Sequence, residues 1–392
     1  MKPTIRQING FAKHYDWGDL RAIHKLRGTA IDGEPLAEIW FGTHRDGPST
    51  LEDGTLLEDV VAPRRPEARV DGLPYLVKLI APAKPLSIQV HPSIAQAEAG
   101  FDLENQLGIA MSAENRTYKD RNHKPEMLLA LTPWRALVGF ADTERLVRFN
   151  EELATPLSLH IAQRLREDGV AETIRDTIAS GIKPARKDVT AYLRRCGELT
   201  EHPDPYISKR AEMVVYVGTF FPTRTSLLVA ALMNIVELDP GEALFTPVGT
   251  VHCYLQGVGL EVMASSSNTI RAGLTNKHID VNGLLKTARM EPTLPLFIEP
   301  EVSTVCESQI RTYQPDVNDF HLEVAEVSDC PLRGRALADT LIVSIEGDAT
   351  VNGDPLRCGY AAWVPTGVDF EITGACQVAV VTVADTPVSW TL

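Results

Sequence analysis

The change of sequence texture along the chain is the feature that most restricts its fold. Up to about residue 140, short apolar runs such as PYLVKLI and LSIQV alternate with turns rich in proline and glycine, which is typical of β-strands. From about residue 141 the spacing becomes helical, with charged faces, and strand-like runs resume after SLLVAALMN. The last part, from about residue 301, is again strand-like. We therefore expect a mainly β protein with one α-helical insertion.

This texture divides the chain into three parts. Residues 1–140 and 229–300 are expected to form one discontinuous β domain, residues 141–228 an inserted helical domain, and residues 301–392 a second β domain. A length of 392 residues is sufficient for two or three domains.

Charge and hydropathy exclude several classes of function. The formal net charge is -14, and no run of lysine or arginine forms the stripe that binding to nucleic acid requires. The first residues lack the apolar core of a signal peptide, and no stretch approaches the roughly 18 apolar residues of a membrane span. We expect a soluble, cytoplasmic monomer that binds neither nucleic acid nor membrane. An anionic substrate would need a local basic pocket.

The cysteines are few and scattered. They form no CxxC pair, so neither a disulfide scaffold nor a thiolate metal site is indicated. Reduced, mostly buried thiols are expected, and Cys253 is interpreted as a core residue rather than a metal ligand. The six are Cys196, Cys253, Cys306, Cys330, Cys358 and Cys376.

An internal repeat links the two β regions. The frame Gly241-x5-Pro247-x-Gly249-x2-His252 recurs as Gly359-x5-Pro365-x-Gly367-x2-Phe370. The glycines and the Pro-x-Gly turn are structural requirements, so both copies can fold alike. Phenylalanine cannot bind a metal. The second copy is therefore expected to be structural only.

The run from Ser87 to His91 alternates polar and apolar residues. In a strand, Ser87, Gln89 and His91 point to one face, while the apolar residues between them, Ile88 and Val90, pack against the other. A Gln-x-His pair offers an amide oxygen and an imidazole to a cation. An ordinary exposed strand face remains the alternative.

A second cluster, Asn122-His123-Lys124-Pro125-Glu126, precedes the apolar run MLLAL, and its charged residues are Lys124 and Glu126. If both charged residues enter the same strand, they share a face. A salt-bridged pair at the start of a strand is the simpler explanation of this cluster alone.

The frame that ends at His252 resembles the second motif of cupin barrels, in which the final histidine is a metal ligand. The asparagine that often follows four residues later is Gln256 here. Gathered inside one barrel, the candidate ligands would offer two imidazoles, one carboxylate and one amide oxygen. Such a set suits one catalytic Zn²⁺ per chain rather than a closed structural site. These ligands are Gln89, His91, Glu126 and His252.

Several separated motifs resemble the type I mannose-6-phosphate isomerases, and their order and spacing extend this resemblance along nearly the whole chain. The motifs are YDWG (15–18), AEIWFGTH (37–44), KPLSIQVHP (84–92), YKDRNHKPEM (118–127), FTPVGTVHCYL (245–255) and LEVMASSSNTIRAGLTNK (260–277).

The resemblance implies a cupin-like β-barrel or jelly-roll catalytic domain, a helical domain and a degenerate cupin-like C-terminal β domain without metal. It implies the same four zinc ligands. The chain departs from the family pattern at Ser267, where an aspartate is common, and at Asn276, where a proline is usual. The pocket residues that the resemblance implies are Ser87, Lys124, Glu261, Arg271 and Lys277.

The hypothesis is a zinc-dependent interconversion of mannose 6-phosphate and fructose 6-phosphate, by proton transfer between C1 and C2 through a cis-enediol(ate). Lys277 and Ser87 are assigned to the phosphate, and Arg271 to the phosphate or to the enediolate. Glu261, alone or with Lys124, is assigned to proton transfer. Without the resemblance, Arg271 and Lys277 would be interpreted as solvated turn cations.

Two alternatives stay open. One is a non-catalytic cupin that binds metal and senses a sugar phosphate. The other is an isomerase of a different phosphorylated sugar, which the departures at Ser267 and Asn276 allow.

Overall fold

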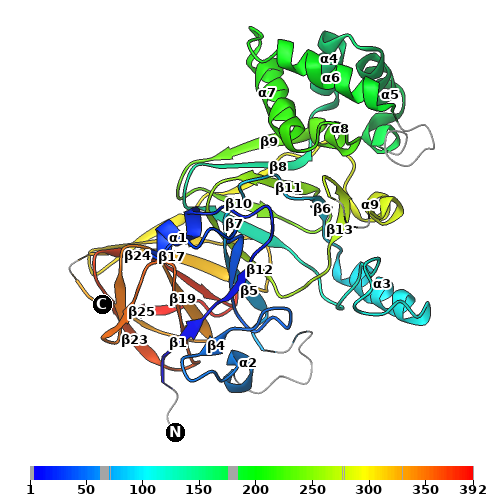
Figure 1. The fold of residues 1–392 in the computed structure, drawn as a ribbon. Coiled ribbons are helices and arrows are strands. Elements are labelled where there is room, and N and C mark those ends of the chain that lie inside the picture. Colours follow the sequence, from blue (N-terminus) through cyan, green and yellow to red (C-terminus); the bar gives the residue numbers. More distant parts are fainter. Residues whose placement is uncertain are drawn as a thin grey trace.

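The strands of the computed structural model form four sheets within the residues that it describes, 4–61, 70, 72–174, 184–275, 277, 279–328 and 330–391 (Figure 1). Sheet I contains, in spatial order, β13 (Ile270–Gly273), β6 (Ile88–Val90), β11 (His252–Gln256), β8 (Trp134–Phe140) and β9 (Met233–Leu238). Sheet II contains β14 (Leu296–Ile298), β10 (Ala243–Thr246), β7 (Glu126–Ala130), β12 (Gly259–Ala264), β5 (Tyr75–Ile80), β3 (Glu38–Phe41) and β2 (Phe11–Lys13).

The other two sheets are formed mostly by the last part of the chain. Sheet III contains β15 (Glu301–Val305), β16 (Ser308–Tyr313), β17 (His321–Val327), β24 (Cys376–Thr382), β19 (Thr340–Glu346), β22 (Ala361–Val364), β1 (Arg6–Asn9) and β4 (Thr50–Leu51). Sheet IV contains β21 (Asp354–Leu356), β20 (Ala349–Val351), β23 (Asp369–Thr373), β18 (Leu332–Arg335) and β25 (Ser389–Thr391).

The helices of the described residues are found mainly between β8 and β9. Asp142 and Asp204 cap the first turns of α4 and α7, which fixes where these helices begin. No helix in the described ranges is both long and apolar enough to span a membrane. The helices are α1 (Ala22–Arg27), α2 (Leu57–Val60), α3 (Ile94–Gln106), α4 (Thr143–Leu153), α5 (Pro156–Ile174), α6 (Arg186–Glu198), α7 (Pro205–Phe220), α8 (Ser226–Ala231) and α9 (Val281–Thr287).

Sheets and helices stack in layers, and each pair of neighbouring layers encloses an apolar core. Helices α4–α8 cover the outer face of sheet I, where Ile88 and Val90 are buried among helical side chains (Figure 1). In sheet II, Leu128 packs against sheet I, whereas Leu129 packs against sheet III, because successive side chains of a strand point to opposite faces. Sheets III and IV enclose the last core. The expected mainly β fold with a helical insertion is confirmed.

The N-terminal strand β1 lies in a different sheet from β2 and β3, the strands that follow it in the sequence. β1 pairs with β22 and with β4, so these two N-terminal strands extend sheet III, whose other strands come from the C-terminal part. Helix α8 spans residue 228, where the expected insertion ends. The division into 1–140 with 229–300, 141–228 and 301–392 stays a prediction.

The two copies of the repeat have the same backbone conformation at their glycines. Gly241 and Gly249 have φ angles of 90° and 80°, and Gly359 and Gly367 have φ angles of 78° and 79°. These left-handed values favour glycine. In the second copy, the residue that replaces His252 is Phe370, which is 3% exposed and packs on Trp390. The spacing of the repeat therefore specifies the turn. The last residue of the repeat determines whether that position offers a metal ligand or a core side chain.

The expectation that all cysteines are free thiols is wrong for two of them. Cys306, in the turn between β15 and β16, forms a disulfide with Cys330, which follows β17. The sequence separation of 24 gives no local signal of this pairing, which arises because the ends of neighbouring strands meet at one edge of sheet III. Cys253 is fully buried, and its thiol donates to the Leu86 carbonyl at 3.0 Å.

Replacing Tyr75 by phenylalanine should lower the free energy of unfolding by about 1–2 kcal/mol. The Tyr75 hydroxyl lies between sheets II and III, 2.9 Å from the Asp339 carbonyl and 3.0 Å from the Val381 carbonyl. The variant leaves these buried acceptors without their donor. Denaturant unfolding measures the change, with Tyr15→Phe, at a 38% exposed residue, as the control. Equal stability of Tyr75→Phe and the parent protein would contradict this role.

Candidate functional site

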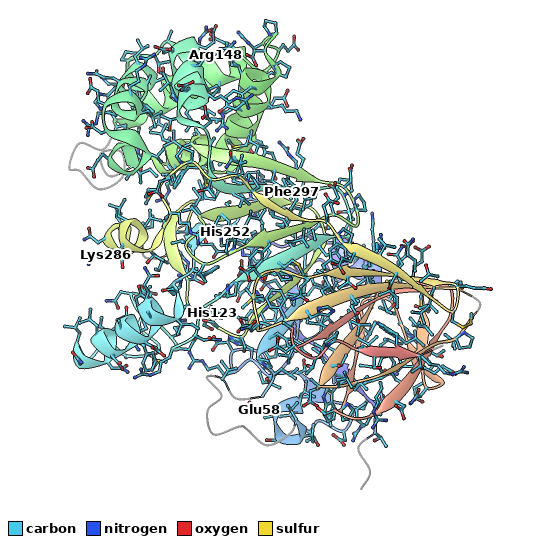
Figure 2. All side chains as sticks on the ribbon, turned by 180° about the vertical axis from the view of Figure 1, so that it is seen from behind. Glu58, His123, Arg148, His252, Lys286 and Phe297 are labelled. Carbon is cyan, nitrogen blue, oxygen red and sulfur yellow. A yellow bond between two sulfur atoms is a disulfide. The ribbon has the colours of Figure 1, made fainter. Side chains whose placement is uncertain are left out.

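The interior of the barrel formed by sheets I and II is polar at one end. In sheet I, Gln89 pairs with His252 on one side and with Arg271 on the other, so the three side chains share one face. In sheet II, Lys78 pairs with Glu261, and Met263, two residues further along β12, pairs with Glu126. The polar side chains of the two sheets therefore face the same interior. Figure 2 places His252 between the helical region that carries Arg148 and the C-terminal sheets.

Three of the four expected ligands converge closely. His91 Nε2 lies 3.3 Å from Glu126 Oε1, and His252 Nε2 lies 3.1 Å from Glu126 Oε2. The side chains are 0–2% exposed, and one potential ligand atom from each lies within 4.8 Å of the others. Gln89, directly beside His252 across the strands, is half-buried and brings its amide to the same end of the barrel.

The donor atoms of this cluster fit a bound metal ion. His91 Nε2, His252 Nε2 and Glu126 Oε2 are buried without a hydrogen-bond partner, and such atoms are costly unless a metal or water satisfies them. The other imidazole nitrogens are already used, since His91 Nδ1 contacts the Asn268 carbonyl at 2.7 Å and His252 Nδ1 contacts the Thr250 carbonyl at 3.0 Å. Such contacts orient a metal-binding histidine.

The electrostatics keep the cluster in the protonation state that a metal requires. Burial, reinforced by Lys124, lowers the pKa of His91 to about 3, which leaves the imidazole neutral. Burial alone would raise the pKa of Glu126, but Lys124 and His91 hold it well below its ordinary value. Lys124 Nζ lies 2.8 Å from Glu126 Oε1, so the expected salt bridge is present and adjoins the ligand cluster.

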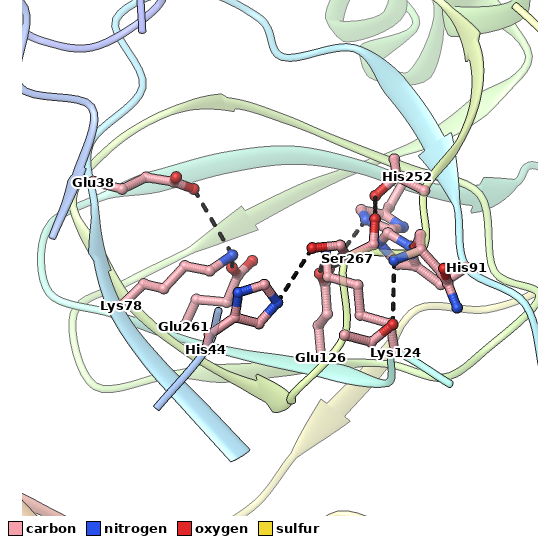
Figure 3. A network of polar contacts seen from close by, with 12 residues as sticks. Glu38, His44, Lys78, His91, Lys124, Glu126, His252, Glu261 and Ser267 are labelled. Atoms are coloured by element: carbon pink, nitrogen blue, oxygen red, sulfur yellow. Dashed lines mark hydrogen bonds and ion pairs between the residues drawn. The ribbon is translucent and has the colours of Figure 1, made fainter. Parts of the chain in front are cut away.

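A row of charged side chains continues across sheet II, and sequence reasoning missed most of it (Figure 3). Lys78 Nζ lies 2.7 Å from Glu261 Oε2 and 3.8 Å from Glu38 Oε1, and all three side chains are buried. Burial alone would lower the pKa of Lys78, but Glu261 and then Glu38 raise it, so the lysine stays charged. The sequence does contain a signal of this row, because a single lysine within the apolar run YLVKLI needs a buried carboxylate partner.

The expected cationic residues lie at the mouth of the same interior. Arg271 is half-buried, and burial lowers its pKa. Lys277 is exposed, with Nζ 5.9 Å from the centre of the Tyr15 ring, and its pKa is lowered by partial burial and then by Arg271 and Lys119. A group of cations at this end of the barrel would favour the binding of an anion. Ser87 is half-buried just before β6, and Asn276 lies outside the described residues.

Ser267, one of the two departures, belongs to a polar network with His44 and Asp46. The Asp46 backbone N–H donates to His44 Nδ1, so the His44 Nε2–H is left to contact the Ser267 hydroxyl at 3.2 Å. That hydroxyl donates to Asp46. A carboxylate is therefore bound directly to the residue that stands where the family commonly has an acid.

This network predicts a loss of stability in mild acid. Burial, reinforced by Lys78 and Lys124 and opposed by Asp46, lowers the pKa of His44 from 6.5 to about 4. Between these pH values the unfolded chain binds a proton that the folded chain does not, so stability falls as pH is lowered, by up to about 1.4 kcal/mol per pH unit for one residue. Denaturant unfolding of the metal-free protein at pH 7, 6 and 5 should show a shallower dependence for His44→Gln. Parallel profiles of variant and parent protein would refute this.

Fold and site together define a cupin-like β protein with a divalent-metal centre in its barrel. The family description "Phosphomannose isomerase type I, catalytic domain" matches residues 5–143. The mannose-6-phosphate isomerase of Escherichia coli is 32% identical over 368 residues, which cover 88% of this chain and 90% of the relative. The chain belongs to the type I mannose-6-phosphate isomerase family.

Further relatives agree along the whole fold. The mannose-6-phosphate isomerase of Salmonella typhimurium is 36% identical over 302 residues, covering 74% of this chain and 75% of the relative. A crystal structure of the Salmonella enzyme, bound to its substrate fructose 6-phosphate and to zinc, superposes with a TM-score of 0.84. The sequence identity is 28%, and the match covers 97% of this chain and 99% of that one.

Proposed function

We propose that this protein is a zinc-dependent isomerase that interconverts D-mannose 6-phosphate and D-fructose 6-phosphate. One observation carries this proposal. His91, Glu126 and His252 converge beside a group of cations, and each has a buried nitrogen or oxygen atom without a hydrogen-bond partner. The zinc- and substrate-bound relative supports the same assignment. Gln89 completes the proposed ligand set with an amide oxygen, which leaves two imidazoles, one carboxylate and one amide around one zinc ion.

The cations at the mouth provide the proposed seat for the phosphate group. Arg271 has a permanent charge and a planar set of donors, and Lys277 adds a point charge. Ser87, which begins the strand that carries Gln89, adds a hydroxyl donor. In a protein with a net charge of -14, this local positive group is what makes an anionic sugar bind.

The proposed proton transfer between C1 and C2 uses Glu261, with Lys124 as the second candidate group. Glu261 is 2% exposed, and its carboxylate accepts a hydrogen bond from Lys78 at 2.7 Å. A carboxylate in this state is able to accept a carbon-bound proton when the sugar displaces water from the interior. Lys78 acts as a positioning residue for this carboxylate. The product of proton removal is the cis-enediol(ate), whose developing negative charge faces Arg271 and Lys124.

Zinc, when bound by the cluster, supplies a Lewis acid beside the sugar oxygens. The residues determine the remainder of the reaction, namely the orientation of the open-chain sugar, the binding of its phosphate and the movement of its proton. We further propose that the protein is a monomer in the cytoplasm, as the sequence predicts.

A coupled assay over a small panel of hexose and pentose phosphates tests this function. We expect turnover of mannose 6-phosphate that a chelator abolishes and that zinc restores. A chelator-sensitive enzyme that prefers another sugar phosphate would instead establish the isomerase of a different sugar. Tight binding of mannose 6-phosphate and zinc without turnover would establish a non-catalytic cupin.

A further inference from the structure

A cleft with a volume of about 790 Å³ lies where helix α1 meets sheets II and III. Figure 1 shows α1 beside strands of both sheet II and sheet III at this place. One wall is Leu129, which points to the opposite face of β7 from Leu128 and Glu126. Sheet II therefore separates this cleft from the metal centre. Its volume is within the range of about 300–1,000 Å³ that is typical of small-molecule sites.

Three cations line the cleft, and none of them has a salt bridge within the described part of the chain. Arg21, Lys25 and Arg311 have no carboxylate oxygen within 4.0 Å among the residues that the structure describes. The Arg311 guanidinium donates from Nη2 to Gln377 Oε1 at 3.0 Å, while its Nε is buried without a hydrogen-bond partner. In a protein with a net charge of -14, these cations give the cleft a local positive group that can attract an anion. This arrangement of cations suits the binding of an anion.

Two carboxylates also line the cleft, and they limit what the anion is. Asp19 is used by the chain itself, because its Oδ1 accepts the backbone N–H groups of Arg21 at 2.7 Å and Ala22 at 2.8 Å. Glu346 is exposed at the end of β19, next to Gln377 in the adjacent strand. It offers an acceptor to hydroxyl or amine groups. A simple inorganic anion would use neither this acceptor nor the space available.

Apolar side chains form the remaining wall. Val258 and Ile345 come from the two sides of the cleft and are 8% and 6% exposed. They suit the ring of a larger ligand rather than its charged part.

We propose that this cleft binds a phosphate ester that carries hydroxyl groups, with the phosphate at Arg311, Arg21 and Lys25. The body of the ligand lies against Val258 and Ile345, and its hydroxyl groups reach Glu346. Because sheets II and III both contribute to the cleft, the occupant contacts both sheets. Nucleoside phosphates and sugar phosphates share this chemistry.

Calorimetric titration of the zinc-loaded protein with ADP, and separately with glucose 6-phosphate, tests the proposal. The titrations use an Arg271→Ala background, in which the proposed phosphate seat of the metal centre is weakened. We expect at least one probe to bind with a submillimolar Kd. Adding Arg311→Gln should weaken this binding by about tenfold or more, since a charge-assisted contact is lost. Which probe binds identifies the ligand as a nucleotide or a sugar phosphate.

Arg333→Gln is the matched control, because Arg333 is an exposed arginine of sheet IV that pairs with Glu371 at 2.6 Å. It should leave probe binding unchanged. Lys25→Gln changes an exposed residue and tests the site without disturbing Arg311, and it should weaken binding at least about threefold. In the otherwise unchanged protein, neither Arg311→Gln nor Lys25→Gln should alter the isomerase rate. Absence of binding by both probes at millimolar concentration, or binding that Arg311→Gln and Lys25→Gln leave unchanged, would overturn the proposal.

Discussion

Replacing His252 by alanine should leave the purified protein without bound zinc. It should also reduce the isomerase rate by more than about 100-fold. The imidazole is fully buried, its Nδ1 is committed to the Thr250 carbonyl, and its Nε2 faces Glu126 with no hydrogen-bond partner. Loss of a residue that merely supports a metal ligand costs about 10–100-fold, so loss of a direct ligand should exceed this. Metal analysis together with the rate under saturating substrate measures both effects.

His123→Ala is the matched control for this variant. His123 belongs to the same sequence cluster as Glu126, but its Nε2 lies 2.8 Å from Asp319 Oδ2, outside the three-residue ligand cluster. The control should keep its zinc and most of its activity. If His252→Ala retained zinc at one ion per chain and turned over at the parent rate, His252 would not be a ligand.

Replacing Arg271 by alanine should reduce kcat/KM by about 10²–10³-fold while zinc stays bound. Arg271 lies beside the proposed zinc ligand Gln89 in the neighbouring strand, and with Lys277 it forms the proposed phosphate seat. Removing one fixed charge-stabilising donor from an active site costs a factor of this size. A rise in KM alone would assign Arg271 to phosphate binding, and a fall in kcat would assign it to the enediolate.

Arg271→Lys should recover part of the loss, since it restores the charge without the planar donor geometry. Arg194→Ala, at an exposed arginine that pairs with Glu198 at 3.3 Å, should have no effect on kinetics. An Arg271→Ala enzyme with unchanged kcat and KM would remove this residue from the active site.

The alternation of residues in strands explains why part of the site was predictable. The run from Ser87 to His91 encodes its own two faces, and the structure buries Ile88 and Val90 on the side away from Gln89. The repeat was equally readable, because its glycines all adopt left-handed conformations that other residues avoid. In both cases the information lies within a few residues of the chain.

What depends on long-range pairing was not predictable in this way. The row from Glu38 through Lys78 to Glu261 requires the register of three strands that are distant in sequence. The joining of β1 to sheet III and the Cys306–Cys330 disulfide likewise depend on which strand ends meet. A single sequence gives the composition of each strand but not its neighbours.

The most direct test of the metal centre is an anomalous diffraction map collected at the zinc absorption edge from crystals of the purified protein. We predict one strong peak within about 2.0–2.2 Å of ligand atoms from His91, Glu126 and His252, with Gln89 adjacent. A map with no peak among these side chains, or with its peak at cysteine thiols, would contradict the account.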